Sequence, residues 1–200
     1  MPQLDFDTLW DYEHPERTET VFRQILLKEE PNTDLSYQLQ LLTQIARAQG
    51  LQRHFTAANA TLDQVQSHLT TNLVQATIRY RLERGRVLNS SGHPEDARAW
   101  FQQAWELAQK HGEDFYAIDA LHMLAIVAPV TEQNSWYTTA LQLAEASTDE
   151  QARNWRGSLY NNMGWTYHDL GEYERALDLF QKGVQFRKAQ GKIRELRIYI

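Results

Sequence analysis

Small and aromatic residues recur along this chain in a spacing that occurs twice. The first copy comprises Gly85, Gly92, Ala97, Phe101 and Ala104, and the second lies 79 residues later, at Gly164, Gly171, Ala176, Phe180 and Gly183. Small residues at these spacings allow two antiparallel helices to cross closely, and the aromatic residue fills the seam between them. The pattern therefore predicts helical hairpins, each a helix, a short turn and a second helix.

One further hairpin fits between the two copies, which shortens the repeat to about 40 residues. Its first helix is expected near 115–127, and Ala125 lies 40 residues after Gly85 and 39 before Gly164. Moving back by the same period gives a fourth hairpin, weaker in pattern, with Gly50 as its expected turn. Repeats of this kind bury their apolar faces by stacking on their neighbours.

These hairpins predict an all-α chain that forms a single α-solenoid domain over residues 1–200. Ahead of them we expect capping helices, a short one at 5–12 and a longer one at 15–29 that Pro31 ends, because the end of a solenoid needs a covered apolar face. The expected segments are an N-terminal cap at 1–31, hairpins at 35–70, 78–111, 115–147 and 149–190, and the start of a further or capping helix at 192–200.

The second copy matches a known repeat pattern, W-x2-L-G-x2-Y followed by A-x3-F, with Tyr160 in place of the Trp and Met163 in place of the Leu. The chain thus resembles tetratricopeptide repeat (TPR) proteins over about 35–190, with clear motifs in 157–190 and 78–111. A period near 40 is similar to that of long-repeat members, such as kinesin light chains and bacterial peptide-sensing regulators. The resemblance implies a right-handed superhelix of antiparallel hairpins whose first helices line a concave groove that binds peptides or partner segments.

The resemblance also implies which residues face that groove, since in this family they lie on the first helix opposite the glycine and aromatic seam. Asn162 falls where several long-repeat members place an asparagine that binds a peptide backbone, and an amide can pair with a backbone of any sequence. The residues selected in this way are Tyr37, Gln40, Gln44 and Arg47; Arg79, Leu82, Glu83, Arg86 and Asn89; Asp119, His122, Met123 and Ile126; and Ser158, Asn161, Asn162, Trp165 and His168.

Several of these residues have a second interpretation. Arg79 and Arg86 either contact an acidic ligand or pair with Glu83 and with glutamates on neighbouring helices. Asn161 and Asn162 are either groove residues or solvated polar residues on an exposed face, and Trp165 either meets a ligand or covers core. The tryptophans expected to pack between helices are Trp100, Trp105, Trp136 and Trp155.

Composition supports the helical prediction and narrows the partner class. Five prolines and nine glycines in 200 residues are few, and 42% hydrophobic residues suffice for a core. The chain has no cysteine, no stretch resembling a secretion signal and no apolar run of the ~20 residues that a membrane span needs, so we expect a cytoplasmic protein. A net charge of -6 argues against nucleic acid or an anionic membrane as partner.

Catalytic and cofactor motifs are not found in the sequence. The seven histidines are all more than ten residues apart, so no helix carries the histidine pair of an H-E-x-x-H zinc site. The phosphate-binding G-x-x-x-x-G-K-[ST], the dinucleotide-binding G-x-G-x-x-G and the nucleophile G-x-S-x-G patterns do not occur either. We therefore expect a protein that is not an enzyme and has no cofactor or metal.

The leading hypothesis is a protein–protein interaction module that binds a peptide or partner segment in its groove. Two alternatives stay open at this point. Residues 1–30 are acidic and 182–200 are basic, so chains could associate head to tail into a homo-oligomer. The chain could also be the sensor part of a larger regulatory protein.

Overall fold

The computed structural model describes residues 6–28 and 34–191, and this part of the chain is helical and has no strand. The predictions for residues 1–5, for the helix end near Pro31 and for the helix at 192–200 lie outside the described residues. The chain divides into two compact units, Met1–His111 and Gly112–Ile200. We describe each unit by itself, and the single continuous domain over residues 1–200 stays a prediction.

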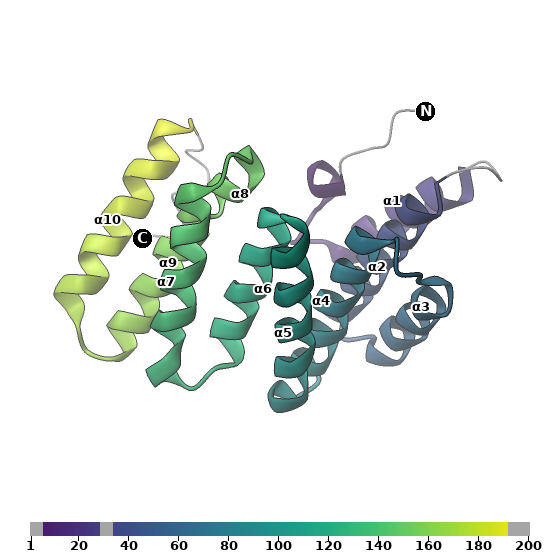
Figure 1. The fold of residues 1–200 in the computed structure, drawn as a ribbon, viewed down its shortest axis with the longest axis horizontal. Coiled ribbons are helices and arrows are strands. Elements are labelled where there is room, and N and C mark those ends of the chain that lie inside the picture. The colour runs from purple at the N-terminus through teal and green to yellow at the C-terminus, as the bar shows by residue number, and fades with distance from the viewer. Residues whose placement is uncertain (1–5, 29–33, 192–200) are drawn as a thin grey trace. The chain divides into compact units, whose positions relative to one another are not determined.

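Unit 1, Met1–His111, stacks helical hairpins side by side (Figure 1). Each helix packs against the next, and α2 also packs against α4, so the first helices of the two hairpins are neighbours. The Asp34 side chain caps the first of these helices by accepting a hydrogen bond from the Ser36 N–H at 3.0 Å. The elements are η1 (Phe6–Leu9), α1 (Pro15–Lys28), α2 (Leu35–Leu51), α3 (Phe55–His68), α4 (Val74–Ser90) and α5 (Pro94–His111).

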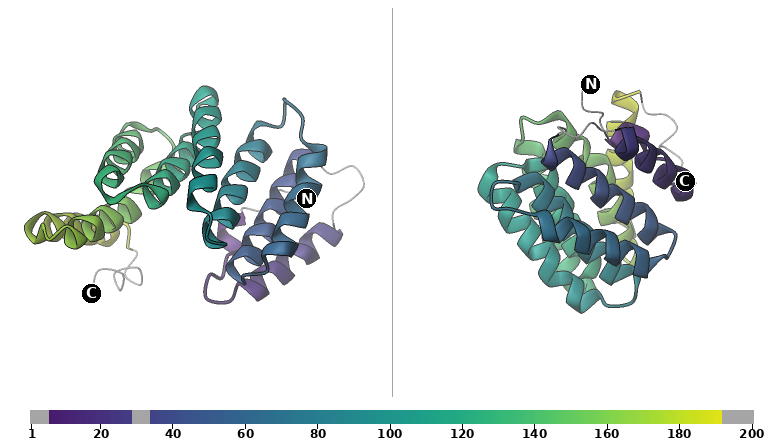
Figure 2. Two further views of the ribbon diagram at one scale, coloured as in Figure 1. Left: turned by 90° about the horizontal axis from the view of Figure 1, so that it is seen from below. Right: turned by 90° about the vertical axis from the view of Figure 1, so that its right-hand side faces the viewer.

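Unit 2, Gly112–Ile200, also pairs neighbouring helices, as the views in Figure 2 show, but its hairpins meet through α7 and α9. In it α6 packs against α7, α7 against α9, and α9 against α10, while the short α8 contacts α6 and α7. Asp149 caps α8 by accepting a hydrogen bond from the Gln151 N–H at 2.9 Å, and Trp155 separates α8 from α9. The elements are α6 (Asp114–Val127), α7 (Val130–Ala146), α8 (Glu150–Asn154), α9 (Arg156–Asp169) and α10 (Tyr173–Ala189).

The seam inferred from the doubled pattern is where the helices cross. A Cβ atom built on Gly85 would lie 2.7 Å from Phe101 Cδ1, and one built on Gly164 would lie 2.7 Å from Phe180 Cδ1. Only glycine leaves room for these rings, because such distances are far inside van der Waals contact. The all-α fold of TPR-like hairpins is thereby confirmed.

The turn of the first hairpin differs from its prediction. Gly92 and Gly171 adopt positive φ in the turns that follow α4 and α9, as the pattern indicates. Gly50, however, lies inside α2, and the residue with positive φ in that turn is Arg53, at φ 62°. Arg53 stands 39 residues before Gly92, so the repeat fixes the turn geometry although the sequence offers no glycine there.

Candidate functional site

Three polar side chains occupy equivalent positions on the first helices of their hairpins. Gln44 in α2, Glu83 in α4 and Asn162 in α9 are separated by 39 and 79 residues, the displacements that relate the hairpins themselves. Gln44 and Glu83 are buried, and Asn162 is half-buried. A buried polar group is costly unless it is hydrogen-bonded. The hydrogen-bond partners of these three side chains therefore indicate which groups each face binds.

In unit 1 the Glu83 carboxylate, which is 2% exposed, pairs with two arginines. Arg86 donates from Nη1 to Glu83 Oε1 at 2.5 Å, and Arg47 Nη1 lies 3.6 Å from the same oxygen. For Arg86, pairing with Glu83 is therefore observed. Glu83 Oε2 is buried without a hydrogen-bond partner. The predicted groove residue Asn89 lies apart from this group, at the end of α4, where its carbonyl accepts a hydrogen bond from the Gly92 N–H at 3.1 Å.

The chain's own N-terminal residues lie on this face. We call Phe6–Tyr12, which contains η1, the strap. Trp10 donates its indole N–H to Gln44 Oε1 at 3.0 Å, and the Arg47 guanidinium lies 5.5 Å from the centre of the Trp10 ring. Two predicted groove residues, Gln44 and Arg47, therefore contact the strap.

Phe6 holds the other end of the strap. Its ring stacks on Tyr37 at a centroid distance of 5.0 Å and meets Phe22 edge-on at 6.2 Å. The Arg79 guanidinium lies 5.3 Å from the centre of the same ring, a cation–π arrangement. Two more predicted groove residues, Tyr37 and Arg79, thus contact the strap.

A polar pocket of about 270 Å³ lies in unit 2. Within it the Asn162 amide nitrogen donates to His122 Nε2 at 2.6 Å, and the Asn161 amide nitrogen donates to Asn162 Oδ1 at 3.3 Å. The structure thus brings together predicted groove residues from α6 and α9. The residues that line the pocket are His122, Trp155, Gly157, Ser158, Asn161, Asn162 and Arg187.

The pocket lining includes two side chains with a buried atom that has no hydrogen-bond partner: Asn161 through Oδ1, an acceptor, and Trp155 through Nε1, a donor. Leaving such a group unpaired costs about 1–3 kcal/mol, so a ligand that supplies both partners gains that energy. A peptide unit carries one N–H and one C=O and can supply both.

Arg187 gives the pocket its charge. It reaches from α10, is 7% exposed, and donates from Nη2 to Ser158 Oγ at 3.3 Å. Its guanidinium lies against Gly157, where a Cβ atom would stand 2.6 Å from Arg187 Cζ. Among the described residues that line the pocket there is no carboxylate. The pocket lining is therefore rich in hydrogen-bond donors, and Arg187 contributes a buried guanidinium to it.

Trp165 and His168, which the sequence also assigns to the groove, lie in a separate aromatic group. Their rings are 5.3 Å apart, and both are exposed. Trp165 meets Phe180 of α10 at 5.4 Å, and His168 meets Tyr173 at the same distance. Their role in a groove stays a prediction.

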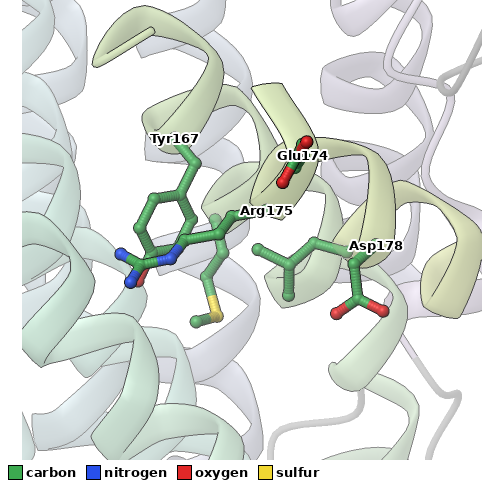
Figure 3. Close-up of a pocket in the computed structure, with 6 residues that line it drawn as sticks. Tyr167, Glu174, Arg175 and Asp178 are labelled. Atoms are coloured by element: carbon green, nitrogen blue, oxygen red, sulfur yellow. The ribbon is translucent and has the colours of Figure 1, made fainter. Parts of the chain in front are cut away.

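A second pocket of about 450 Å³ lies between α9 and α10 (Figure 3). It is lined by Met163, Tyr167, Glu174, Arg175, Asp178 and Leu179. Arg175 is paired with Glu172 at 2.6 Å and also lies over the Tyr167 ring, while Asp178 is paired with Lys182 at 2.7 Å. Arg175 and Asp178 are thus already paired on the surface, so the pocket at Asn161 is the stronger candidate.

The described helices present neither a metal-ligand cluster nor a membrane span. Within residues 6–28 and 34–191, no three His, Cys, Asp or Glu side chains are grouped as ligands of a metal ion. None of the helices described is long and apolar enough to span a bilayer.

Three residues of the two faces escaped the sequence analysis. Trp10 lies in the expected cap, Trp155 was assigned to packing between helices, and Arg187 belongs to a second helix, where the repeat rule does not look. A signal for Arg187 was present, however. Gly157 stands two helical turns before Gly164, on the same side of α9, and marks a second place where α10 comes close.

Comparison with known proteins agrees with this architecture. A family model for the tetratricopeptide repeat matches residues 156–189, which span α9 and α10. A search of curated proteins gives no match. One similar solved structure is that of BtubC (BKLC) from P. vanneervenii, at 11% identity and a TM-score of 0.62, covering 98% of this chain and 89% of that chain. At this identity the likeness shows the fold alone. Residues 156–189 thus match the tetratricopeptide repeat, and the described residues have the fold of a helical repeat protein of that type.

Proposed function

We propose that this chain captures a segment of a partner protein on its first-helix faces, and that the unit 2 pocket anchors one peptide unit of that segment. Proteins of this fold generally bind protein partners and serve as non-catalytic scaffolds. The observation that carries the proposal is the pair of unpaired buried atoms, Asn161 Oδ1 and Trp155 Nε1, in one pocket. A bound backbone satisfies both without requiring a particular sequence.

The charge of the pocket favours an acidic side chain next to the anchored peptide unit. Arg187 is buried in the pocket, and its described lining holds no carboxylate. A guanidinium makes paired hydrogen bonds to carboxylates, so an aspartate or glutamate of the partner fits this position.

The test begins with a displayed peptide library selected on the immobilised full-length chain. The affinity of the selected peptide is then measured for Trp155→Phe, which removes the indole N–H and keeps most of the ring, and for Asn161→Ala. We expect each substitution to weaken binding by roughly tenfold, the equivalent of about 1.4 kcal/mol. Thermal stability should change little, because Trp155→Phe removes an N–H that is unpaired in the free chain, and Asn161→Ala removes the unpaired Oδ1 together with one long hydrogen bond to Asn162.

The matched control is Asp178→Ala, in the other pocket of the same unit. It should leave the affinity unchanged. The pocket assignment is wrong if Asp178→Ala abolishes binding while Trp155→Phe and Asn161→Ala bind as the original chain does.

Self-association is a second candidate, favoured by an exposed apolar group at α10. Leu177 is 57% exposed and Tyr173 is 64% exposed, so two large apolar side chains of this helix face solvent. Light scattering of the chain and of Leu177→Glu would detect it, since a monomer in both cases excludes this contact.

The cytoplasmic location, the acidic character of the partner and the exclusion of nucleic acid and membrane rest on composition and stay predictions.

A further inference from the structure

The α2–α4 face of unit 1 is contacted by a segment of the same chain. The strap, Phe6–Tyr12, contacts Tyr37, Gln44 and Arg47 on α2 and Arg79 on α4. Gln44 is the positional equivalent of Asn162 in unit 2. The same helical position therefore meets the chain's own indole in unit 1 and lines an open pocket in unit 2.

The strap is held to α2 and α4 through aromatic side chains. Trp10 and Tyr12 stack on each other at 4.8 Å, and the Arg47 guanidinium lies 5.5 and 5.6 Å from their ring centres. The backbone hydrogen bonds described for the strap's end run instead toward α1, from the Asp11 N–H to Thr18 Oγ1 at 2.9 Å. Side-chain contacts of this kind can break without unravelling a helix.

The charges of the strap and of the α2–α4 face beneath it are complementary. The strap and its flanks carry acidic residues at positions 5, 7, 11 and 13 of the sequence. The face beneath carries Arg47, Arg79 and Arg86, and Arg47 and Arg86 share the buried Glu83 carboxylate. A basic face that holds aromatic rings is suited to an acidic segment with aromatic side chains four residues apart, as Phe6 and Trp10 are.

We propose that the strap is an exchangeable internal ligand of the α2–α4 face, and that this face admits a partner segment of the same chemistry, acidic and with aromatic residues four positions apart, when the strap is released. The tethered strap competes at an effective concentration on the order of millimolar, so a partner in solution binds weakly until the strap is weakened. The proposal concerns unit 1 and does not rest on the unit 2 pocket.

The test uses a fluorescent synthetic peptide of residues 4–14 and the full-length chain. Fluorescence anisotropy should show that Trp10→Ala, which loosens the strap, binds this peptide at least tenfold more tightly than the unsubstituted chain. Adding Gln44→Met to Trp10→Ala should abolish the gain, because the Trp10 indole of the peptide loses its acceptor. Adding Gln103→Met, an exposed glutamine on α5, should preserve it.

A second measurement needs no substitution. Hydrogen exchange of the Trp10 indole N–H, followed by NMR, should proceed through local opening, at least tenfold faster than the slowest amides of α2 and α4. The proposal is overturned if this proton exchanges only with global unfolding. It is equally overturned if the peptide binds the original and Trp10→Ala chains alike, or binds neither.

Discussion

At the scale of single residues, burial sets the acid–base behaviour of Tyr137. Burial raises the pKa of its phenol from 10.0 to about 12. Between these values the unfolded chain loses the phenolic proton while the folded chain keeps it, so the contribution of this group to stability is present below pH 10 and is lost as the pH rises toward 12.

This shift predicts a pH dependence that a single substitution removes. Between pH 9 and pH 11 the original chain should lose roughly 1 kcal/mol more unfolding free energy than Tyr137→Phe, at about 1.4 kcal/mol per unit of pKa difference. Urea unfolding of both chains at several pH values measures the difference. Identical pH profiles would show that the Tyr137 phenol ionises normally.

Two pairs of residues show why the candidate site was only partly predictable. Asn161 and Asn162 were found because they follow the repeat register, which a sequence displays directly. Trp10 and Trp155 were not found because their roles depend on contacts between segments far apart in sequence, such as the bond from Trp10 to Gln44 and the ring contact of Trp155 with His122. No period along the chain carries that information.

At the scale of helices and turns, we predict that two helical glycines respond to alanine with stability changes of opposite sign. Gly85→Ala should destabilise the chain by roughly 1–3 kcal/mol, because the new methyl group collides with the Phe101 ring. Gly50→Ala should instead stabilise it by roughly 0.5–1 kcal/mol, since its Cβ would stand 3.6 Å from Val87 and alanine favours helix. Chemical unfolding of both variants gives the comparison, and equal signs would contradict the seam.

The turn after α2 supplies a third prediction. Arg53 holds a left-handed backbone at φ 62°, where its equivalent in the next hairpin is Gly92. Arg53→Gly should therefore raise the unfolding free energy by roughly 0.5–1 kcal/mol, relieving a strain of about 1–2 kcal/mol at some cost in unfolded-state entropy. Thermal unfolding measures it, and a lowered midpoint would mean that the arginine side chain stabilises this turn.

The helices themselves were predictable because two kinds of signal agree. Helical spacing of apolar residues marks the hairpins, and small residues mark where they cross. The Gly50 error arose where these signals separate, because a glycine near a helix end resembles a turn although the helix continues to Leu51. The break at Trp155 also carries no Pro or Gly to announce it.

At the scale of the whole molecule, the polar face of the first helices differs between the two units in what contacts it. In unit 1 the strap contacts the face, while in unit 2 the pocket at Asn161 keeps a buried donor and acceptor unpaired. The division at His111 was not predicted, because the hairpin period runs through that point without a change in pattern.

The most direct test of this account is an NMR titration of the full-length chain with a peptide selected from a displayed library. The chain has six tryptophans, whose indole N–H signals report on separate places and are assigned by single substitutions to phenylalanine. The account predicts that the Trp155 indole signal moves most, together with the side-chain amide signals of Asn161 and Asn162. A Trp155 signal that stays in place while Arg175 and other residues of the second pocket shift would contradict it.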